Sequence, residues 1–231
     1  MTTLFLTGID TDIGKSIACG ALANTLLRSS NLFRSKDKIF TQKWVETGTN
    51  TDSQDLQTHQ NIAQMVFNTG STEHHSPYRF KYPASPHLSA KIEHTEINCD
   101  FLAQQTQQLE AQCDHLIIEG AGGLCVPINS NTLIVDLVEE LKLPVILVTS
   151  ARLGSINHTI LSLEACKQRD IEVRAVIYNH YPEQNEIIFT DTRDYLQQYL
   201  SAKHKDTLWL ELATNNNKID ISEKQINFLL R

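Results

Sequence analysis

The chain has 231 residues, of which 41% are hydrophobic and 20% charged, values that are ordinary for a folded globular domain. A chain of this length buries roughly 70–75% of its unfolded surface in one large domain. Twenty Lys and Arg against 27 Asp and Glu give a net charge of −7. This balance excludes a broad positive field that would attract nucleic acid or an anionic membrane surface.

The cysteine spacing and the apolar runs further restrict the class of protein. Five cysteines occur without any Cys-x-x-Cys spacing, which argues against a disulfide framework or a zinc knuckle. The N-terminal apolar run is too short for a signal peptide, and no stretch approaches 18 apolar residues. We therefore expect a cytoplasmic protein with reduced thiols that binds neither nucleic acid nor membrane.

The first predicted elements are a short buried strand at residues 4–6 and a helix at 17–27. Between them, residues 8–16 read Gly-Ile-Asp-Thr-Asp-Ile-Gly-Lys-Ser. A glycine-bounded loop between a strand and a helix is the context of a phosphate-binding loop (P-loop), where backbone N–H groups and the helix N-terminus hold anions. Lys15 is expected to reach the β- and γ-phosphates, and the Ser16 hydroxyl to bind Mg²⁺. Five residues separate the two glycines, one more than usual, and a chance Gly-Lys-Ser remains the alternative.

Strand-like and helical stretches alternate along the rest of the chain. Further strands are predicted at 38–43, 115–119, 145–149 and 174–179, and further helices at about 52–68, 99–112, 132–141, 155–169 and 184–201. This alternation predicts an α/β fold, a P-loop NTPase-like single domain over residues 1–231 whose mainly parallel sheet has helices on both faces. Residues 70–98 are predicted to form a long ordered loop over one edge of the sheet, with His74 and His75 exposed. Polar turns are expected at 203–206 and 215–218.

Polar side chains stand where predicted strands end, which is where ligands of open α/β sheets bind. Lys43, Glu119 and Asn179 are such residues, and a glycine-rich turn is expected after Glu119. A P-loop enzyme needs an acidic Mg²⁺ partner at a neighbouring strand end, and Glu119 meets this requirement. Asp55 is a second candidate, with Asp52 as its alternative. A merely solvated lysine is the alternative reading of Lys43.

Five motifs together resemble the dethiobiotin synthetase family. The first is the P-loop with its five intervening residues. The others are Lys-Trp-Val-Glu-Thr-Gly at 43–48, Pro-Ala-Ser-Pro-His at 83–87, Glu-Gly-Ala-Gly-Gly at 119–123 and Leu-Gly-Ser-Ile-Asn-His at 153–158. They occur in the family's order within residues 4–180.

This resemblance implies an ATP-dependent ligase of biotin biosynthesis that closes the ureido ring of dethiobiotin from 7,8-diaminononanoate and CO₂ or bicarbonate. The reaction passes through a carbamate and a carbamic–phosphoric anhydride, in a homodimer with active sites at the interface. The implied catalytic residues are Lys15, Lys43 and Thr11. The implied nucleotide-binding residues are Asp12, Ile13, Gly14, Lys15, Ser16, Ile17, Glu119 and Asn179. The implied substrate-binding residues are Thr11, Lys43, Thr47, Ser155, Ile156 and Asn157, and the implied Mg²⁺ ligands are Ser16, Asp55 and Glu119. Ser155 is also expected to cap the helix that begins there.

The chain departs from the family pattern at two places. Trp44 stands where the family has a proline, which bears on how Lys43 is presented. The family's Gly-x-[Ile/Leu]-Pro base-binding turn is expected near residues 207–212, but neither its glycine nor its proline is present there. We therefore hypothesise a looser preference for ATP over other nucleotides.

Two other functions are weighed against the ligase. The first is a nucleotide-driven dimeric switch of the partition or metallochaperone class. Loops of that class usually carry a second lysine near the first glycine, and no lysine precedes Lys15 here. The second is an amidotransferase-type ligase acting on a corrinoid, which normally needs a glutaminase domain for which a chain of this length leaves no room.

Overall fold

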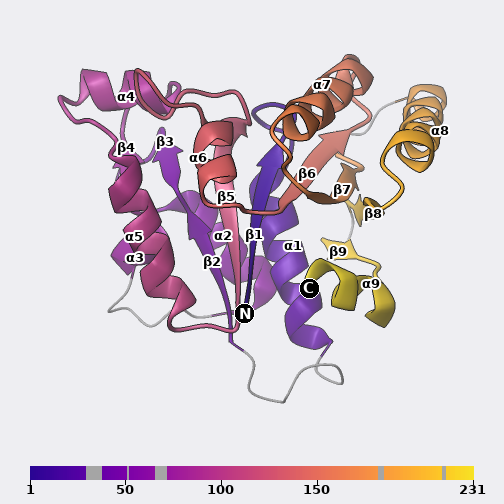
Figure 1. Ribbon diagram of the computed structural model, residues 1–231, viewed down its shortest axis with the longest axis horizontal. Helices are drawn as coiled ribbons and strands as arrows, with labels where there is room; N and C mark the ends of the chain where they lie inside the picture. The colour runs from indigo at the N-terminus through magenta and orange to yellow at the C-terminus, as the bar shows by residue number, and fades with distance from the viewer. Residues whose placement is uncertain (30–37, 51, 66–71, 182–184, 215–216) are drawn as a thin grey trace.

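A sheet of parallel strands forms the centre of the molecule in the computed structural model, which describes residues 1–29, 38–50, 52–65, 72–181, 185–214 and 217–231. The strand order in this described part is β2-β5-β1-β6-β7-β8-β9 (Figure 1). The strands are β1 (Thr2–Gly8), β2 (Ile39–Lys43), β5 (His115–Gly123), β6 (Val145–Ser150), β7 (Val173–Asn179), β8 (Leu208–Ala213) and β9 (Lys218–Ile219). Neighbouring strands run parallel except β8 and β9, which pair antiparallel.

Helices cover both faces of this sheet. In Figure 1, α6 lies in front of β5 and α2 lies behind it. The helices of the described residues are α1 (Lys15–Arg28), α2 (Gln54–Ala63), α3 (Thr72–His75), α4 (Pro86–Ile92), α5 (Cys99–Glu110), α6 (Ile134–Glu140), α7 (Ser155–Gln168), α8 (Glu186–Lys203) and α9 (Glu223–Leu229). Because both faces are covered, the central strands are apolar without alternation, and Leu116, Ile117 and Ile118 of β5 are all fully buried.

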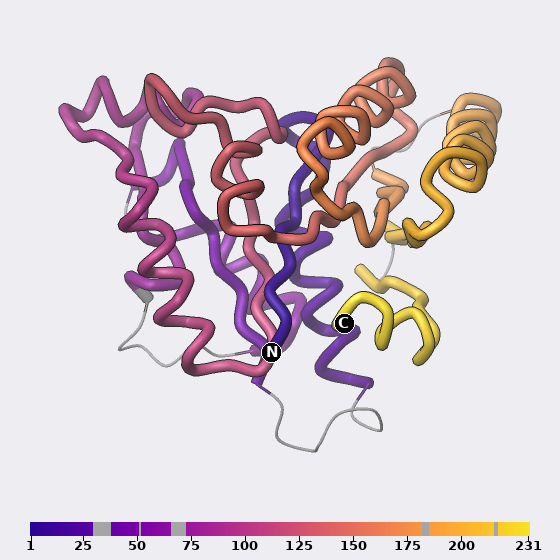
Figure 2. The backbone as a smooth tube through the Cα atoms, viewed as in Figure 1, coloured from indigo at the N-terminus to yellow at the C-terminus, as the bar shows by residue number. Residues whose placement is uncertain are grey.

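The N- and C-termini lie close together, on the side of the molecule opposite the carboxyl ends of the parallel strands (Figure 2). The Thr2 hydroxyl donates a hydrogen bond of 2.6 Å to the carbonyl oxygen of Leu230. Among the described residues, every helix is either too short or too polar to cross a lipid bilayer.

The predicted α/β class and the mainly parallel sheet are confirmed, as are the predicted strands and helices upstream of residue 203 that fall on described residues. One predicted turn differs within this region. The predicted glycine-rich turn after Glu119 continues β5 instead, because Gly123 pairs with Gly8 of β1. Residues 66–68 of the predicted second helix, and residue 184 of the last one, lie outside the described residues.

The prediction of one long loop over residues 70–98 is wrong. This segment contains α3, α4 and a three-residue strand, β4 (Tyr78–Phe80). β4 pairs in parallel with β3 (Val45–Thr47), forming a second small sheet. His75 is buried rather than exposed, and its Nδ1 lies 2.6 Å from the carbonyl oxygen of Thr41. α3 and β4 have only four and three residues, too few to show periodicity, so their sequence does not reveal them.

The region around residues 207–212, where the family's base-binding turn is expected, is strand β8, which pairs with β7. Of the predicted turn at 215–218, Lys218 begins β9, and residues 215–216 lie outside the described residues. Helix α9 follows. These C-terminal elements extend the sheet beyond the strands that the alternating pattern predicts.

Candidate active site

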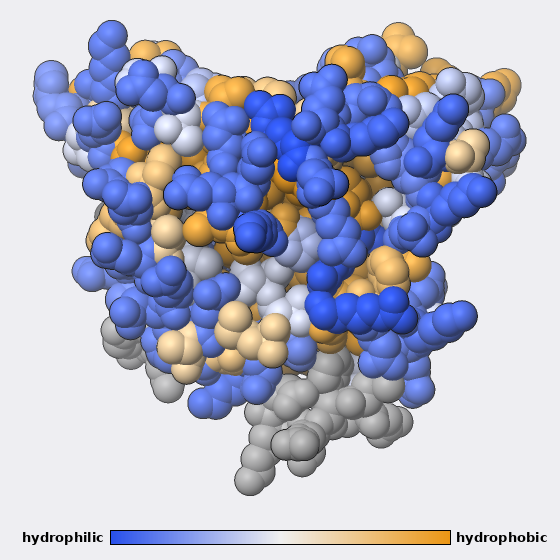
Figure 3. Space-filling model, viewed as in Figure 1, coloured by the Kyte–Doolittle hydropathy of each residue, from blue (hydrophilic) through white to orange (hydrophobic). Residues whose placement is uncertain are grey.

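A polar pocket lies at the carboxyl ends of β1, β2 and β5. The parallel strands point toward the upper edge of the molecule, which Figure 3 shows hollowed between the α4 side and the α7 side. The pocket brings together many of the residues predicted for the site. Its lining includes Thr11, Asp12, Lys15, Ser16, Lys43, Thr47, Asp55 and Glu119, together with Val45, Glu46, Gly48, Gln54, Ala121 and Gly122.

The loop between β1 and α1 turns tightly before the helix begins. Gly14 caps α1 with a φ of 85°, a left-handed conformation that a side chain would strain. A Cβ at this position would also lie 2.2 Å from Nδ2 of Asn179. That amide nitrogen donates to the carbonyl oxygen of Ile13 at 2.9 Å. The side-chain amide of Asn179, at the end of β7, therefore supports the loop, and a side chain at position 14 would have to displace this amide as well as adopt a strained left-handed backbone.

Lys15 is buried at the base of this loop. Its Nζ donates to the backbone oxygen of Asp10 at 2.8 Å. Burial, and then the nearby positive charge of Lys43, lower the pKa of Lys15 to about 8. The structure thus keeps two ammonium groups at one site at an energetic cost, which an anion in the pocket would offset.

Lys43 lies among carboxylates at the tip of β2. In the sheet register it pairs with Glu119, which lies within β5, so the two residues are neighbours across the sheet. Its Nζ lies 2.6 Å from Glu119 Oε1 and 2.8 Å from Asp55 Oδ2, and donates to the Gly120 carbonyl oxygen at 3.0 Å. Burial alone would lower the pKa of Lys43, but the two carboxylates raise it above its ordinary value. Lys43 is therefore a charged donor whose three N–H groups all have protein partners.

Oxygen ligands converge beside Lys43. The Ser16 hydroxyl lies 2.6 Å from Asp55 Oδ1 and 3.0 Å from Glu119 Oε1. Although burial favours the protonated acid, the charge of Lys43 and the hydrogen bond from His59 hold the pKa of Glu119 well below its usual range. Two carboxylates and a hydroxyl are the hard oxygen donors that Mg²⁺ prefers, so this donor set fits that ion. Of the two candidate carboxylates, Asp55 on α2 lines the pocket, whereas Asp52, which precedes this helix, is exposed.

Three contacts of the site were not predicted from the sequence. His59 donates from α2 to Glu119 Oε2 at 2.6 Å. Glu46 Oε1 accepts from the backbone N–H groups of Gln54 and Asp55, at 2.8 and 3.2 Å, and so helps to cap α2 beside the pocket. Asp10 forms an ion pair with Arg152 that ties the P-loop to the segment before α7. A lone histidine or glutamate on a short helix or strand carries no spacing signal, so these roles depended on the tertiary fold.

The predicted substrate residues on α7 do not line this pocket. The expectation that Ser155 caps α7 is wrong, because the cap is Gly154 in a left-handed conformation, and the Ser155 side chain is buried instead. Ile156 is half-buried and Asn157 is exposed. Ile17 follows the P-loop on α1 and is half-buried.

Trp44 is accommodated in the core rather than in the pocket. Its ring packs on Phe5 with a centroid distance of 4.8 Å, and its indole Nε1 donates to Thr106 Oγ1 at 3.1 Å. Its backbone N–H also donates to the Glu119 carbonyl oxygen at 3.2 Å, a bond that a proline could not form. Tryptophan at this position therefore links β2 to the strand that carries Glu119.

Comparison with known proteins shows the family to which this chain belongs. A family model described as an AAA domain matches residues 2–205. The ATP-dependent dethiobiotin synthetase BioD 2 of Haemophilus ducreyi is 43% identical over 208 residues, covering 90% of this chain and 96% of that protein. The ATP-dependent dethiobiotin synthetase BioD of Chlorobaculum tepidum is 38% identical over 194 residues, covering 84% and 79%. The chain belongs to the dethiobiotin synthetase family. The family predicted from the motifs is thus confirmed, and so is the predicted enzyme class, an ATP-dependent ligase.

Solved structures resemble the chain more remotely. A plasmid partition protein from Borrelia burgdorferi has 13% identity and a TM-score of 0.56, covering 99% of this chain and 96% of that one. The MinD cell division protein of Aquifex aeolicus has 10% identity and a TM-score of 0.52, covering 100% and 87%. At such identities the likeness shows the fold alone, and it confirms the predicted P-loop NTPase-like architecture of this dethiobiotin synthetase relative.

Proposed function

We propose that this chain closes the ureido ring of dethiobiotin from 7,8-diaminononanoate, CO₂ and ATP. The observation that carries the proposal is the pairing of two buried lysines, Lys15 and Lys43, in one pocket with Ser16, Asp55 and Glu119. One substrate amine adds to CO₂ and loses a proton, giving a carbamate. A carbamate oxygen then attacks the γ-phosphorus and ADP leaves. The second amine attacks the carbonyl carbon of the mixed anhydride and expels phosphate.

Phosphoryl transfer of this kind depends on positioning and charge neutralisation rather than on a protein nucleophile. We assign Lys15 and the loop backbone from Asp12 to Ile17 to the phosphates of ATP. Lys43 is assigned to the carbamate and the γ-phosphoryl group, two anions that would otherwise repel each other. Since all three Lys43 donors are bound to protein here, Lys43 must exchange at least one of these partners for a substrate oxygen. Thr11 and Thr47 line the same pocket and are assigned to carbamate or phosphate oxygens.

Mg²⁺ is the cofactor of this proposal. Ser16, Asp55 and Glu119 would hold it, because their oxygens already converge. When bound, the ion neutralises phosphate charge. Asn179, which now bonds to the P-loop backbone, is assigned to the adenine base at the end of β7.

The proposal also includes a single domain over residues 1–231, a cytoplasmic location and a homodimer. Leu153, just before α7, and Leu161, in the middle of α7, are 87% and 59% exposed, and apolar exposure of this degree favours a covering partner. In such a dimer the N-terminus of the partner's α7, at Ser155, Ile156 and Asn157, would bind the substrate carboxylate. A sedimentation mass of twice 26.1 kDa is expected.

The test of this function is phosphate release from MgATP with and without 7,8-diaminononanoate and bicarbonate, followed by mass analysis of the product. We expect release that depends on the diamine and a product with the mass of dethiobiotin. Diamine-independent hydrolysis would favour the nucleotide-driven switch, for which the shared fold is the supporting observation.

Nucleotide preference is a separate prediction. The family's base-binding glycine and proline are missing near residues 207–212. Loss of one hydrogen bond to the base removes about tenfold of the selectivity for ATP. We therefore expect CTP and GTP to support phosphoryl transfer at rates within about tenfold of the rate with ATP. Steady-state rates with the three nucleotides at equal concentration measure it. A preference for ATP of several hundredfold would contradict the looser site.

A further inference from the structure

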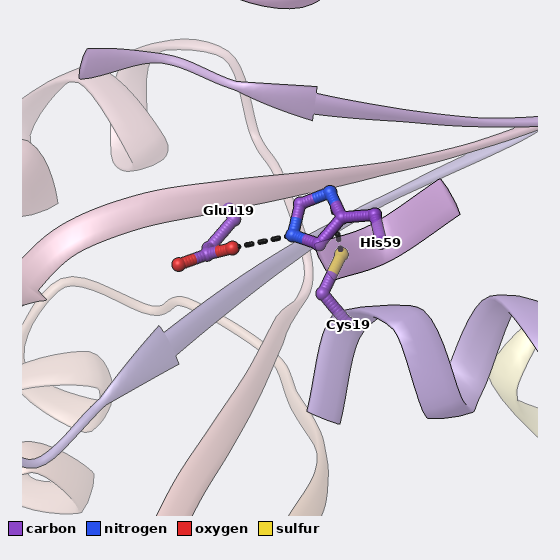
Figure 4. A group of neighbouring side chains, drawn as sticks. All are labelled: Cys19, His59 and Glu119. Atoms are coloured by element: carbon purple, nitrogen blue, oxygen red, sulfur yellow. Dashed lines mark hydrogen bonds and ion pairs between the residues drawn. The ribbon is translucent and has the colours of Figure 1, made fainter. Parts of the chain in front are cut away.

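One buried side chain beside Glu119 has no part in the chemistry proposed above. His59 is fully buried, and its Nε2 lies 2.6 Å from Glu119 Oε2 (Figure 4). An ionised carboxylate only accepts hydrogen bonds, so the imidazole donates through Nε2. On its other side, Nδ1 lies 3.0 Å from Thr41 Oγ1 and 3.9 Å from the sulfur of Cys19. The ring is thus held between β2, α1 and the carboxylate.

Cys19, His59 and Glu119 form a group of side chains of the kind that bind metals, with ligand atoms within 4.8 Å of one another. Their contacts favour a hydrogen-bonded chain over a metal site. Cys19 faces Nδ1, whereas Glu119 contacts Nε2, so the three do not converge on one point. Burial, and then the charge of Glu119, raise the pKa of the Cys19 thiol well above its ordinary value, which disfavours the thiolate that metals bind.

The two oxygens of Glu119 have separate partners. Oε2 accepts from His59 inside the protein, while Oε1 lies 2.6 Å from Lys43 Nζ and 3.0 Å from Ser16 Oγ, on the side of the pocket. A carboxylate is planar, so holding one oxygen fixes the direction of the other. Without the imidazole, Oε2 would be a buried acceptor lacking this partner, and the group would turn to find another.

We propose that His59 is a positioning residue, which holds Glu119 Oε2 so that Oε1 is presented to the divalent cation of the nucleotide. This inference rests on the proposed function, in which Glu119 binds Mg²⁺. Partners that orient a metal ligand are worth about 10–100-fold in metal affinity when they are removed.

Three substitutions separate this role from simple packing. The side-chain amide of His59→Gln reaches as far as Nε2 and can still donate to Oε2. The shorter amide of His59→Asn ends near the position of Nδ1, so it can contact Thr41 but not Glu119. His59→Leu keeps similar volume and removes both contacts. A Thr41→Val variant serves as the matched control, because it removes only the partner of Nδ1.

The experiment is a titration of each full-length variant with Mn²⁺ in the presence of a non-hydrolysable ATP analogue, with free Mn²⁺ followed by electron paramagnetic resonance. We expect His59→Gln and Thr41→Val to bind Mn²⁺ within about threefold of the original chain, and His59→Asn and His59→Leu to bind it about 10–100-fold more weakly. Binding of the analogue without metal should be unchanged in all variants. Thermal unfolding identifies variants that do not fold. If His59→Leu does not fold, the difference in Mn²⁺ affinity between His59→Gln and His59→Asn tests the proposal.

Equal Mn²⁺ affinity in folded His59→Asn and the original chain would overturn the proposal, as would equal weakening in His59→Gln and His59→Asn. Failure of the proposed function is a different result, since it would appear in the original chain as phosphate release that does not depend on the diamine.

Discussion

The Lys43→Gln variant is expected to lose about 10²–10³-fold in kcat for dethiobiotin formation, with ATP affinity within about threefold of the original chain. Glutamine keeps a hydrogen-bond donor but removes the charge. Charge on Lys43 acts on the transferring phosphoryl group and the attacking carbamate, and therefore stabilises the transition state more than bound ATP. The environment is suited to this task, because Glu119 and Asp55 keep the pKa of the lysine above its ordinary value and so keep it charged.

Steady-state kinetics with the diamine, together with calorimetric titration of an ATP analogue, separates the two effects. Lys38→Gln is the matched control, since Lys38 precedes the same strand and is exposed, so the change in net charge is identical. Removing Lys43 also leaves the buried carboxylate of Glu119 without its cation, and thermal unfolding must show that the variant is folded. Unchanged kcat in a folded Lys43→Gln protein would refute the role given to this lysine.

The Lys15→Gln variant is expected to lose both binding and turnover. Loss of a charged hydrogen bond to phosphate should weaken ATP affinity about 10–100-fold. Loss of charge beside the β- and γ-phosphates should lower kcat by about 10²–10³-fold as well. In the structure burial lowers the pKa of Lys15 to about 8, so its charge is maintained at neutral pH against a desolvation cost that bound phosphate would offset.

The same calorimetric and kinetic measurements apply here, with Lys91→Gln as the control for charge because Lys91 is exposed on α4. ATP affinity equal to that of the original chain would contradict the placement of phosphate at the P-loop. The two lysine variants thus differ in one measured quantity: the affinity for ATP is expected to fall in Lys15→Gln and to stay within about threefold of the original chain in Lys43→Gln.

Several site residues could be predicted because their chemistry is encoded locally. The P-loop is one continuous segment in which a strand, glycines and a helix N-terminus occur in fixed order, so Lys15 and Ser16 were identified without contacts. Glu119 and Lys43 were found because each ends a predicted buried strand, and parallel strands bring their carboxyl ends to one edge. The choice of Asp55 over Asp52 needed the fold, since both are acidic residues close to the start of the same helix.

Elements and contacts that depend on distant partners could not be predicted. β4 has only three residues and exists because β3 pairs with it. His59 lies 60 positions from Glu119 in the sequence, and no spacing rule connects them. Gly154 rather than Ser155 caps α7 because the backbone there adopts a left-handed turn, which the presence of a serine does not reveal.

The amino-acid sequence by itself determined the class of fold, the phosphate-binding loop, the family and the identity of the charged groups, because periodicity, glycine spacing and strand ends are local properties of the chain. Only the tertiary structure decided which carboxylate joins Lys43, how the oxygens of Glu119 are divided between His59 and the pocket, and where Trp44 packs. These outcomes are set by which strands and helices become neighbours, and hydrogen bonds in a buried site form only where that packing brings donor and acceptor within about 3 Å.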